Sequence, residues 1–228
     1  MPLSPEQEAE VIGRLPLFAG VPDVVVERLL MRRHPTAHRE GEVIFQEGDP
    51  AGQFYIVLAG VVKIIRGRRG GAEVLLDLLQ TGDTIAECSF CASDFHTFSA
   101  EAVTDARLIG IDVGVISACL VENSALASVL LRVQQRHVDM MMKQVEQMKL
   151  MTSAQRVAMF MLRFADRSGE RAAFRLPHEK ALIAQLLGMS AESFSRVLAR
   201  LKGLGVLVDG REITITSVHK LRQLIEHR

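Results

Sequence analysis

The sequence has no long apolar run and few cysteines. No stretch of about 18 consecutive apolar residues occurs, which excludes an ordinary membrane-spanning helix. No basic segment followed by an apolar core opens the chain, so the signal-peptide pattern is missing and we expect a cytoplasmic protein. The 3 cysteines in 228 residues are few and odd in number, which argues against a disulfide framework.

The chain also has no net charge, but this balance hides two unlike parts. Residues 1–142 contain 12 Lys and Arg against 19 Asp and Glu, whereas residues 143–228 contain 15 against 8. A basic segment is the expected electrostatic footprint of phosphate binding. The length is enough for two modest cores, so we expect two domains, of which the C-terminal one binds nucleic acid.

A helix-turn-helix is indicated in this basic part. The segment 178–187 fits one helix, and 190–201 fits a second. Between them, Gly188 is a typical helix stop and Ser190 a typical N-cap for the helix that follows. In this motif the second helix enters the major groove of DNA with its N-terminal residues nearest the bases. We therefore predict that the second helix reads DNA sequence.

The predicted second helix carries residue types that read bases. Glu192, Ser195 and Arg196 follow one another at helical spacing. Arginine binds guanine O6 and N7 bidentately, a carboxylate accepts from the cytosine amine, and a short hydroxyl contacts a base edge. Ser193 is a further candidate DNA contact, and Arg200 is expected at phosphate. The alternative is a solvated helix face on which Glu192 and Arg196 only pair with each other.

A β-hairpin is predicted directly after this helix. Two short β-rich runs within 206–215 meet at Asp209-Gly210, a dipeptide that favours a type I′ turn. A hairpin in this position is a wing. Arg211, beside its tip, is a candidate phosphate contact, and an exposed turn arginine is the alternative.

The N-terminal part has a different pattern. After a short helical region around 22–31, β-rich segments recur between turn signals such as Gly48-Asp49 and Gly82-Asp83. Many short strands with regular turns predict an antiparallel jelly roll. The expected strands cover residues 43–45, 54–58, 61–65, 74–78, 84–85, 98–102 and 107–111.

Two runs in these strands carry a resemblance to a known family. GEVIFQEGDPA at 41–51 and FYIVLAGVVKI at 54–64 resemble the opening of the cyclic-nucleotide-binding-type β-roll in the Crp/Fnr family of bacterial transcription regulators. The resemblance extends over both parts of the chain in the family's order. It implies an α+β fold: an N-terminal antiparallel β-roll, a long dimerisation helix and a C-terminal winged helix-turn-helix.

The recognition helix resembles one branch of this family in particular. The pattern Glu192-x-x-Ser195-Arg196 is similar to that of Fnr and Dnr members, which implies a palindrome close to TTGAT-N4-ATCAA. The wider run looks most like the Dnr branch, regulators of denitrification that respond to nitric oxide. The resemblance thus implies double-stranded DNA, a second copy of the chain and RNA polymerase as partners, and genes of anaerobic nitrogen-oxide respiration as targets.

One departure from the family pattern concerns cyclic AMP. Members that bind it carry a Gly-Glu pair and then an Arg-Ser or Arg-Thr pair, whose arginine neutralises the cyclic phosphate. This chain has Ala86-Glu87 and His96-Thr97 at those places. A buried phosphate without that arginine would be costly to desolvate, so we do not expect cyclic AMP as the effector.

A second departure concerns iron–sulfur clusters. Fnr holds its cluster on cysteines near the N-terminus, whereas the first 40 residues here contain none. Cys88, Cys91 and Cys119 are fewer than the usual four thiolate ligands, so we expect neither this cluster nor another metal site. Cys88 and Cys91 form a C-x-x-C that could suit a metal or a redox pair. Without a second pair, small apolar thiols are the favoured interpretation.

The Dnr resemblance implies nitric oxide as the effector and haem b as the cofactor. The chain has no C-x-x-C-H motif, so haem would be noncovalent and held by an axial side chain such as histidine. His96 lies where the family places its effector-contacting arginine. His34, His38 and His137 are the other candidates, and each of the four can instead be an ordinary surface or hydrogen-bonded histidine.

A long amphipathic helix is predicted from Ser124 to about Met151, because apolar residues recur at steps of mostly three and four. The stripe can pack on its own β-roll, whereas the family resemblance implies that it pairs with a second copy. The candidate dimerisation residues are Leu130, Val133, His137, Met141, Val145 and Met148. We expect this seam and the segment 151–153 to form the element that reorients the DNA-binding domains.

Together these inferences predict a sensor domain at 1–122, a dimerisation helix at 123–151 and a DNA-binding domain at 152–228, in a regulator rather than an enzyme. Two alternatives stay open. One is an Fnr-like regulator without an effector of its own. The other is a nucleotide-regulated enzyme subunit or channel module carrying the β-roll, against which the wing and the basic C-terminal part argue.

Overall fold

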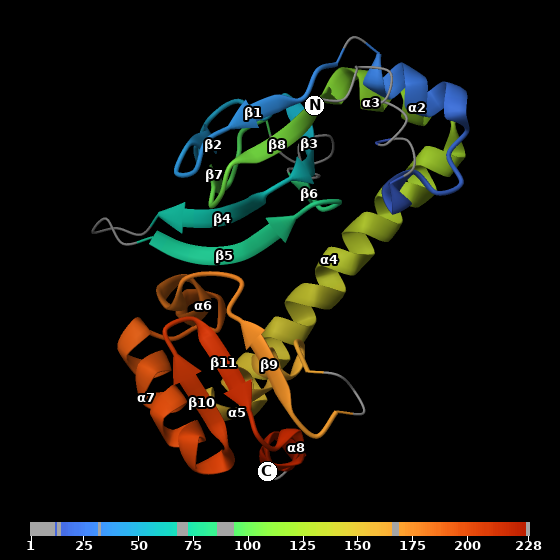
Figure 1. Cartoon of the computed structure of the whole chain (residues 1–228). Helices are drawn as coiled ribbons and strands as arrows, with labels where there is room; N and C mark the ends of the chain where they lie inside the picture. The colour runs from blue at the N-terminus through green and yellow to red at the C-terminus, as the bar shows by residue number, and fades with distance from the viewer. Residues whose placement is uncertain are drawn as a thin grey trace, which may run out of the picture. The chain divides into compact units, whose positions relative to one another are not determined.

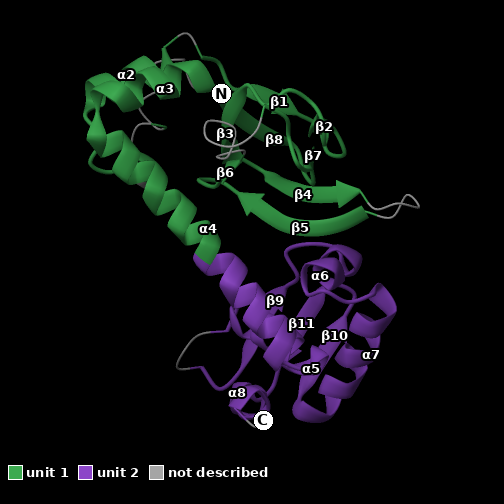
Figure 2. Ribbon diagram, turned by 180° about the vertical axis from the view of Figure 1, so that it is seen from behind, with its two compact units in different colours: residues 1–138 green, residues 139–228 purple. Residues whose placement is uncertain are grey.

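The computed structural model describes residues 12, 15–31, 33–67, 73–85, 94–165 and 169–226. The chain divides into two compact units, residues 1–138 and 139–228, and the division falls inside one long helix (Figure 2). The sequence instead predicts that helix as a separate segment between two domains. Four residues discussed above, Ala86, Glu87, Cys88 and Cys91, lie outside the described residues.

The first unit contains two antiparallel four-stranded sheets (Figure 1). One has the order β1 (Thr36–His38), β8 (Ala106–Asp112), β3 (Gln53–Ala59) and β6 (Thr84–Ile85). The other has the order β2 (Val43–Phe45), β7 (Ser99–Ala102), β4 (Val61–Gly67) and β5 (Glu73–Gln80). All seven predicted strands are confirmed to within two residues at each end. β1 was not predicted, because its Thr-Ala-His run has no bulky apolar residue that would mark a strand.

The alternation of side chains along β3 and β8 builds two cores. Val57 and Leu108 point between the sheets, whereas Phe54 and Ile109 point to the opposite side. On that opposite side they pack with four helical elements, which are η1 (Pro16–Phe18), α2 (Asp23–Leu30), α3 (Val113–Glu122) and the first half of α4 (Ser124–Leu150). One sheet is therefore covered on both faces, which explains its apolar strands.

The turn between β3 and β4 requires glycine. Gly60 has φ +82°, and a Cβ added there would lie 2.7 Å from Cα of Ala106. Any side chain would therefore collide with backbone at the start of β8 as well as adopt a left-handed conformation.

The second unit contains a three-stranded antiparallel sheet and helices around one core. Its strands have the order β10 (Val206–Asp209), β11 (Glu212–Ile215) and β9 (Ala172–Arg175). Its helices are α5 (Ser153–Leu162), α6 (Lys180–Leu186), α7 (Ala191–Leu201), η3 (Lys202–Leu204) and α8 (Val218–Glu226).

The first turn of helix α5 is fixed by hydrogen bonds. Thr152 and Gln155 form a capping box, which satisfies two otherwise unpaired N–H groups. The side chain of Gln155 also donates to the carbonyl of Leu224 in α8 at 3.1 Å.

No helix among the described residues combines the length and the apolar character needed to cross a membrane.

Candidate DNA interface and effector site

The turn between α6 and α7 is the predicted helix-turn-helix turn. Gly188 has φ +66°, and its N–H donates to the Gln185 carbonyl at 2.9 Å. The N–H of Met189 donates to the Ala184 carbonyl, also at 2.9 Å, and this pair of bonds is the Schellman arrangement that ends a helix at glycine. Ser190 then caps α7 with its side chain. The predicted glycine stop and serine cap are confirmed.

The helix α7 has one buried face and one exposed polar face. Its buried residues are Phe194, Val197, Leu198 and Leu201. Glu192, Ser195 and Arg196 are exposed on the other side, with Arg200 one turn later. The apolar face fixes the helix in the core of the second unit, and the predicted base-reading residues project to the outside.

Arg196 does not have the partner expected for a solvated helix face, on which it would pair with Glu192. Its Nη2 donates to Oγ of Ser193 at 3.1 Å, and the hydroxyl of Ser190 donates to the same oxygen at 3.0 Å. Among the described salt bridges there is none between Arg196 and Glu192. The two residues therefore remain separate groups on the exposed face.

The wing forms as a two-stranded hairpin with a turn one residue later than expected. Asp209 pairs with Glu212 in the β10–β11 ladder, so the two turn residues are Gly210 and Arg211. Gly210 has φ +56°. The dipeptide signal located the hairpin correctly, but glycine occupies the first turn position, where positive φ is required in both common hairpin turns.

Arg211 is engaged within the second unit rather than extended from the wing tip. Its Nη2 donates to the Leu176 carbonyl at 2.8 Å, and its Nη1 bonds Oε1 of Glu179 at 2.9 Å. Burial and the nearby charge of Arg211 lower the pKa of His178. Arg211 thus ties the wing to the segment before α6, and its contact with phosphate stays a prediction.

A groove of about 380 Å³ runs between α7 and the wing strand β10. Two lysines that the sequence analysis missed, Lys180 and Lys202, line it together with Ser195 and Ala199. The spacing of Ser195, Ala199 and Lys202 is that of one helix face, so this signal was available for Lys202. Lys180 reaches the groove only through the fold, because it lies at the start of α6.

The predicted dimerisation residues fall into two groups along α4. Leu130 and Val133 are only 7% and 2% exposed, and they lie in the core of the first unit. This corrects their assignment to a partner-facing seam, because they are already covered by their own β-roll unit. Met141, Val145 and Met148 are exposed. His137 lies between the groups and is half-buried.

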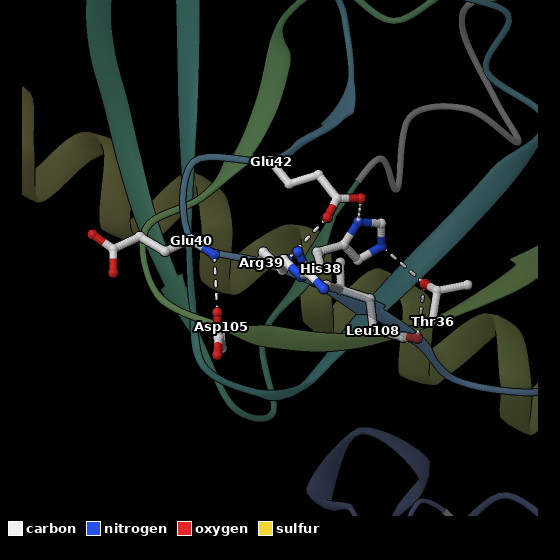
Figure 3. Close-up of polar contacts among 7 residues, drawn as sticks. All are labelled: Thr36, His38, Arg39, Glu40, Glu42, Asp105 and Leu108. Carbon is white, nitrogen blue, oxygen red and sulfur yellow. Dashed lines mark hydrogen bonds and ion pairs between the residues drawn. The ribbon is translucent and has the colours of Figure 1, made fainter.

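His38 has hydrogen-bond partners on both ring nitrogens (Figure 3). Nε2 lies 2.9 Å from Oγ1 of Thr36, and Nδ1 lies 3.1 Å from Oε1 of Glu42. The N–H of Arg39 donates to the same carboxylate, and this bond lowers the pKa of Glu42. An iron ligand needs a free imidazole nitrogen, so His38 does not fit that role as it stands.

His96 offers a better fit to haem. Its ring is buried and stacks on Phe45 with centroids 3.7 Å apart and planes 13° apart, and Phe45 also contacts the rings of Tyr55 and Phe98. Burial lowers the pKa of His96, against an opposing effect of Asp49. An apolar aromatic setting and a neutral imidazole suit an iron ligand.

The two remaining histidines differ in their surroundings. His34 is exposed just before β1. His137 influences the core-facing residue Asp77 of β5: burial raises the pKa of Asp77, while the charge of His137 lowers it. Among the described residues, no three His, Cys, Asp or Glu side chains gather as a metal site.

Comparison with known proteins places both units in known domain families. The Cyclic nucleotide-binding domain family matches residues 35–123, and the Crp-like helix-turn-helix domain family matches residues 155–224. The first match covers every strand of the two sheets. The second covers α5 to α8, including α7 and the wing.

Proteins similar over nearly the whole chain share both domains. The CRP-like cAMP-activated global transcriptional regulator of Mycobacterium tuberculosis is 28% identical over 217 residues, which are 93% of this chain and 97% of that protein. The Cyclic AMP receptor protein of Thermus thermophilus is 30% identical over 196 residues, 84% of this chain and 88% of that protein. The crystal structure of DNR from Pseudomonas aeruginosa matches with a TM-score of 0.54 and 27% identity, covering 98% of this chain and 100% of that one. The chain belongs to the Crp/Fnr family and is a DNA-binding transcription regulator.

Proposed function

We propose that a homodimer of this chain binds a palindrome close to TTGAT-N4-ATCAA, with α7 of each copy in one half-site. The observation that carries this proposal is the exposed N-terminal face of α7, where Glu192, Ser195 and Arg196 stand apart from the buried face. An arginine that reads guanine and a glutamate that reads cytosine match the single G·C pair in TTGAT. Lys180 and Lys202 in the adjacent groove add positive charge beside the same helix.

Fluorescence anisotropy with labelled duplexes tests the half-site. We expect Arg196→Ala to lose about 1–3 kcal/mol of discrimination against a duplex in which the guanine is replaced. Arg200→Ala is the matched comparison. It should weaken binding to all sequences and reduce the slope of log affinity against log salt by about 1, as a phosphate contact does. Equal losses on every duplex for Arg196→Ala would make it a phosphate contact instead.

The second half of α4 provides the surface for pairing. Leu131, Val138 and Val145 recur every seven residues, and Met141 and Met148 lie three residues after the last two. All five are exposed in the single chain, and this spacing is that of a coiled-coil seam. Regulators of this family bind DNA as dimers, and a palindrome requires two-fold symmetry. The seam therefore runs along these residues rather than through Leu130 and Val133.

For the effector, we propose nitric oxide sensed through noncovalent haem b, with His96 as the axial ligand. The similarity to DNR of Pseudomonas aeruginosa supports this branch, as does the buried aromatic setting of His96. Haem would supply the iron that binds nitric oxide. The chain's own contribution is to hold a neutral imidazole beside Phe45 and to exclude water from it.

An absorption spectrum of the protein reconstituted with haem tests this assignment. We expect a bound-haem spectrum that changes on addition of nitric oxide and that is lost in His96→Ala. His34→Ala is the control, because His34 is exposed and should leave the spectrum unchanged. If His34→Ala or His137→Ala abolishes haem binding and His96→Ala does not, the assignment of His96 is wrong.

A second candidate effector is cyclic AMP, because the Mycobacterium tuberculosis and Thermus thermophilus relatives are named for it. Calorimetric titration with cyclic AMP decides between the two. We expect no binding, since His96 stands where an arginine would pair with the phosphate. If neither ligand changes DNA affinity, the regulator has no effector of its own and acts through its abundance.

Transcription in vitro connects DNA binding to gene control. We expect the dimer to recruit RNA polymerase at promoters of anaerobic nitrogen-oxide respiration genes that carry the palindrome. A template with the half-site guanines replaced serves as the control. Equal transcript from both templates would contradict the proposed targets.

A further inference from the structure

One arginine in the second unit joins the ends of two helices. Arg156 of α5 donates from Nε to the carbonyl of Leu187 at 3.1 Å and from Nη1 to the carbonyl of Met151 at 2.9 Å. Met151 directly follows α4, and Leu187 is the C-cap of α6. A single guanidinium therefore bridges the C-terminal ends of α4 and α6.

The chemistry of this bridge suits arginine. Carbonyl groups at the end of a helix have no partner within it, and they carry the negative end of the helix dipole. Arginine stays charged and presents several N–H donors in a rigid fork, so it can serve two carbonyls at once. Arg156 is half-buried, which strengthens these charge-assisted bonds relative to an exposed site. A lysine would offer a single point charge at this position.

A second contact joins the same two regions. The side chain of Met148, in the last turn of α4, lies over Gly188 in the turn between α6 and α7. Its sulfur is 3.0 Å from the place a Cβ at Gly188 would occupy. The glycine that ends α6 therefore also makes room for Met148.

Residues 151–153, expected from the sequence to act as a hinge, make several hydrogen bonds in this structure. The carbonyl of Met151 accepts from Arg156, and its N–H donates to Gln147 at 3.0 Å. Thr152 is fixed by its capping box with Gln155. Only Met151 and Thr152 separate α4 from α5, so the bonds of Arg156 act directly on this short connection.

We propose that Arg156 is a positioning residue that fixes the helix-turn-helix to the last turn of α4 and so sets the orientation of α7 in this arrangement. The inference rests on the proposed DNA-binding role of α7.

Hydrogen exchange measured by mass spectrometry on the full chain tests the bridge itself. We expect Arg156→Met to speed exchange of the peptide containing Met151 and of the peptide containing Leu187 by about tenfold or more, because two charge-assisted bonds are lost. Arg156→Lys should lie between this variant and the native chain. Arg163→Met is the matched control, since Arg163 is the C-cap of the same helix and is exposed. Unchanged exchange in Arg156→Met would overturn the proposal.

The ratio of specific to nonspecific DNA affinity distinguishes a positioning role from a purely structural one. At equal unfolding free energy, we expect Arg156→Met to weaken palindrome binding about tenfold while leaving nonspecific binding at low salt unchanged, because α7 keeps its charges but not its orientation. Arg156→Lys should restore part of the specific affinity. Equal loss on both DNAs would contradict a positioning role. If the native chain itself fails to prefer the palindrome, the proposed function is wrong. The hydrogen-exchange experiment still tests whether Arg156 bridges the two helices.

Discussion

The two halves of α4 contain similar apolar residues in opposite surroundings. In the first half, Leu126, Val129 and Val133 lie in the core of the first unit, packed with α2, α3 and the back of β3 and β8. In the second half, Val138 and Val145 are exposed. The periodicity is nearly the same throughout, but the first half is covered by its own chain and the second half is not.

This difference shows what a helical stripe can and cannot identify. An apolar stripe establishes which side of a helix is removed from water, and it does not establish what covers that side. In α4 the residues that cover the apolar stripe change along the helix. The stripe itself also shifts by one residue: Leu130 and Val133 belong to the buried set, whereas the exposed heptad set begins at Leu131. The exposed second half leaves a surface for the second copy that we propose.

The largest expected effect comes from removing core volume in the first half. We predict that Leu126→Ala lowers the free energy of unfolding by about 2–5 kcal/mol, because it leaves a cavity among buried side chains. Met142→Ala, on the exposed second half, should change the free energy of unfolding by less than about 0.5 kcal/mol. Urea denaturation of both variants measures these changes. Equal losses in the two variants would remove the distinction between the halves.

A charge placed on the second half should act on association instead. We predict that Val145→Asp raises the dimer dissociation constant at least about thirtyfold, or about 2 kcal/mol, because a carboxylate would be buried without a partner in the seam. Sedimentation equilibrium measures the constant. Val121→Asp is the control, since Val121 is 89% exposed but lies on α3. A dimer that tolerates Val145→Asp would mean that α4 pairs through another face.

A smaller effect is expected where the second half meets the helix-turn-helix. We predict that Gly188→Ala lowers the free energy of unfolding of the second unit by about 1–2 kcal/mol, because φ is +66° and alanine disfavours the left-handed region. Gly210→Ala has a similar positive φ but open space around it. The excess loss at Gly188, measured by thermal unfolding, reports the cost of displacing Met148. No excess would mean that Met148 moves aside freely.

The smallest effect concerns pH at the junction of the two halves. Burial raises the pKa of Asp77 in the folded state above that in the unfolded state, although His137 on α4 opposes the shift. The stability that the protonated form contributes is present below the unfolded pKa and is lost as pH rises through the folded pKa. We therefore predict that Asp77→Asn flattens the fall in stability that begins as pH rises above the ordinary pKa of an aspartate. Urea denaturation as a function of pH checks it, and an unchanged slope would show that Asp77 is well solvated.

Local patterns were sufficient for the parts of the fold that depend on local physics. The strands of the β-roll alternate visibly between turn residues, and both ends of the α6–α7 turn have residues with strong conformational preferences. Gly188 ends one helix because only glycine adopts its φ without strain, and Ser190 begins the next because its hydroxyl accepts a backbone N–H. Neither feature requires knowledge of distant residues.

The features that local patterns missed depend on segments far apart in the chain. An arginine at a hairpin tip has the same sequence pattern whether it faces DNA or its own protein, and only folding brings the Leu176 carbonyl to Arg211. Likewise, Lys180 and Lys202 share a groove although they are on different helices. Arg156 gave no signal at all, because its partners are backbone carbonyls, which every residue has.

The ring of Tyr55 gives the protein a natural optical reporter. The chain has no tryptophan and a single tyrosine, and that tyrosine stacks on Phe45, whose ring also stacks on His96. Ultraviolet emission from the native protein therefore originates almost entirely in the first unit, one ring away from the candidate effector histidine. A ligand arriving at His96 should quench this emission directly, whereas DNA arriving at α7 has no fluorophore nearby to change. Occupancy of the sensor unit can thus be followed in the unlabelled protein while DNA binding is measured separately on a labelled duplex.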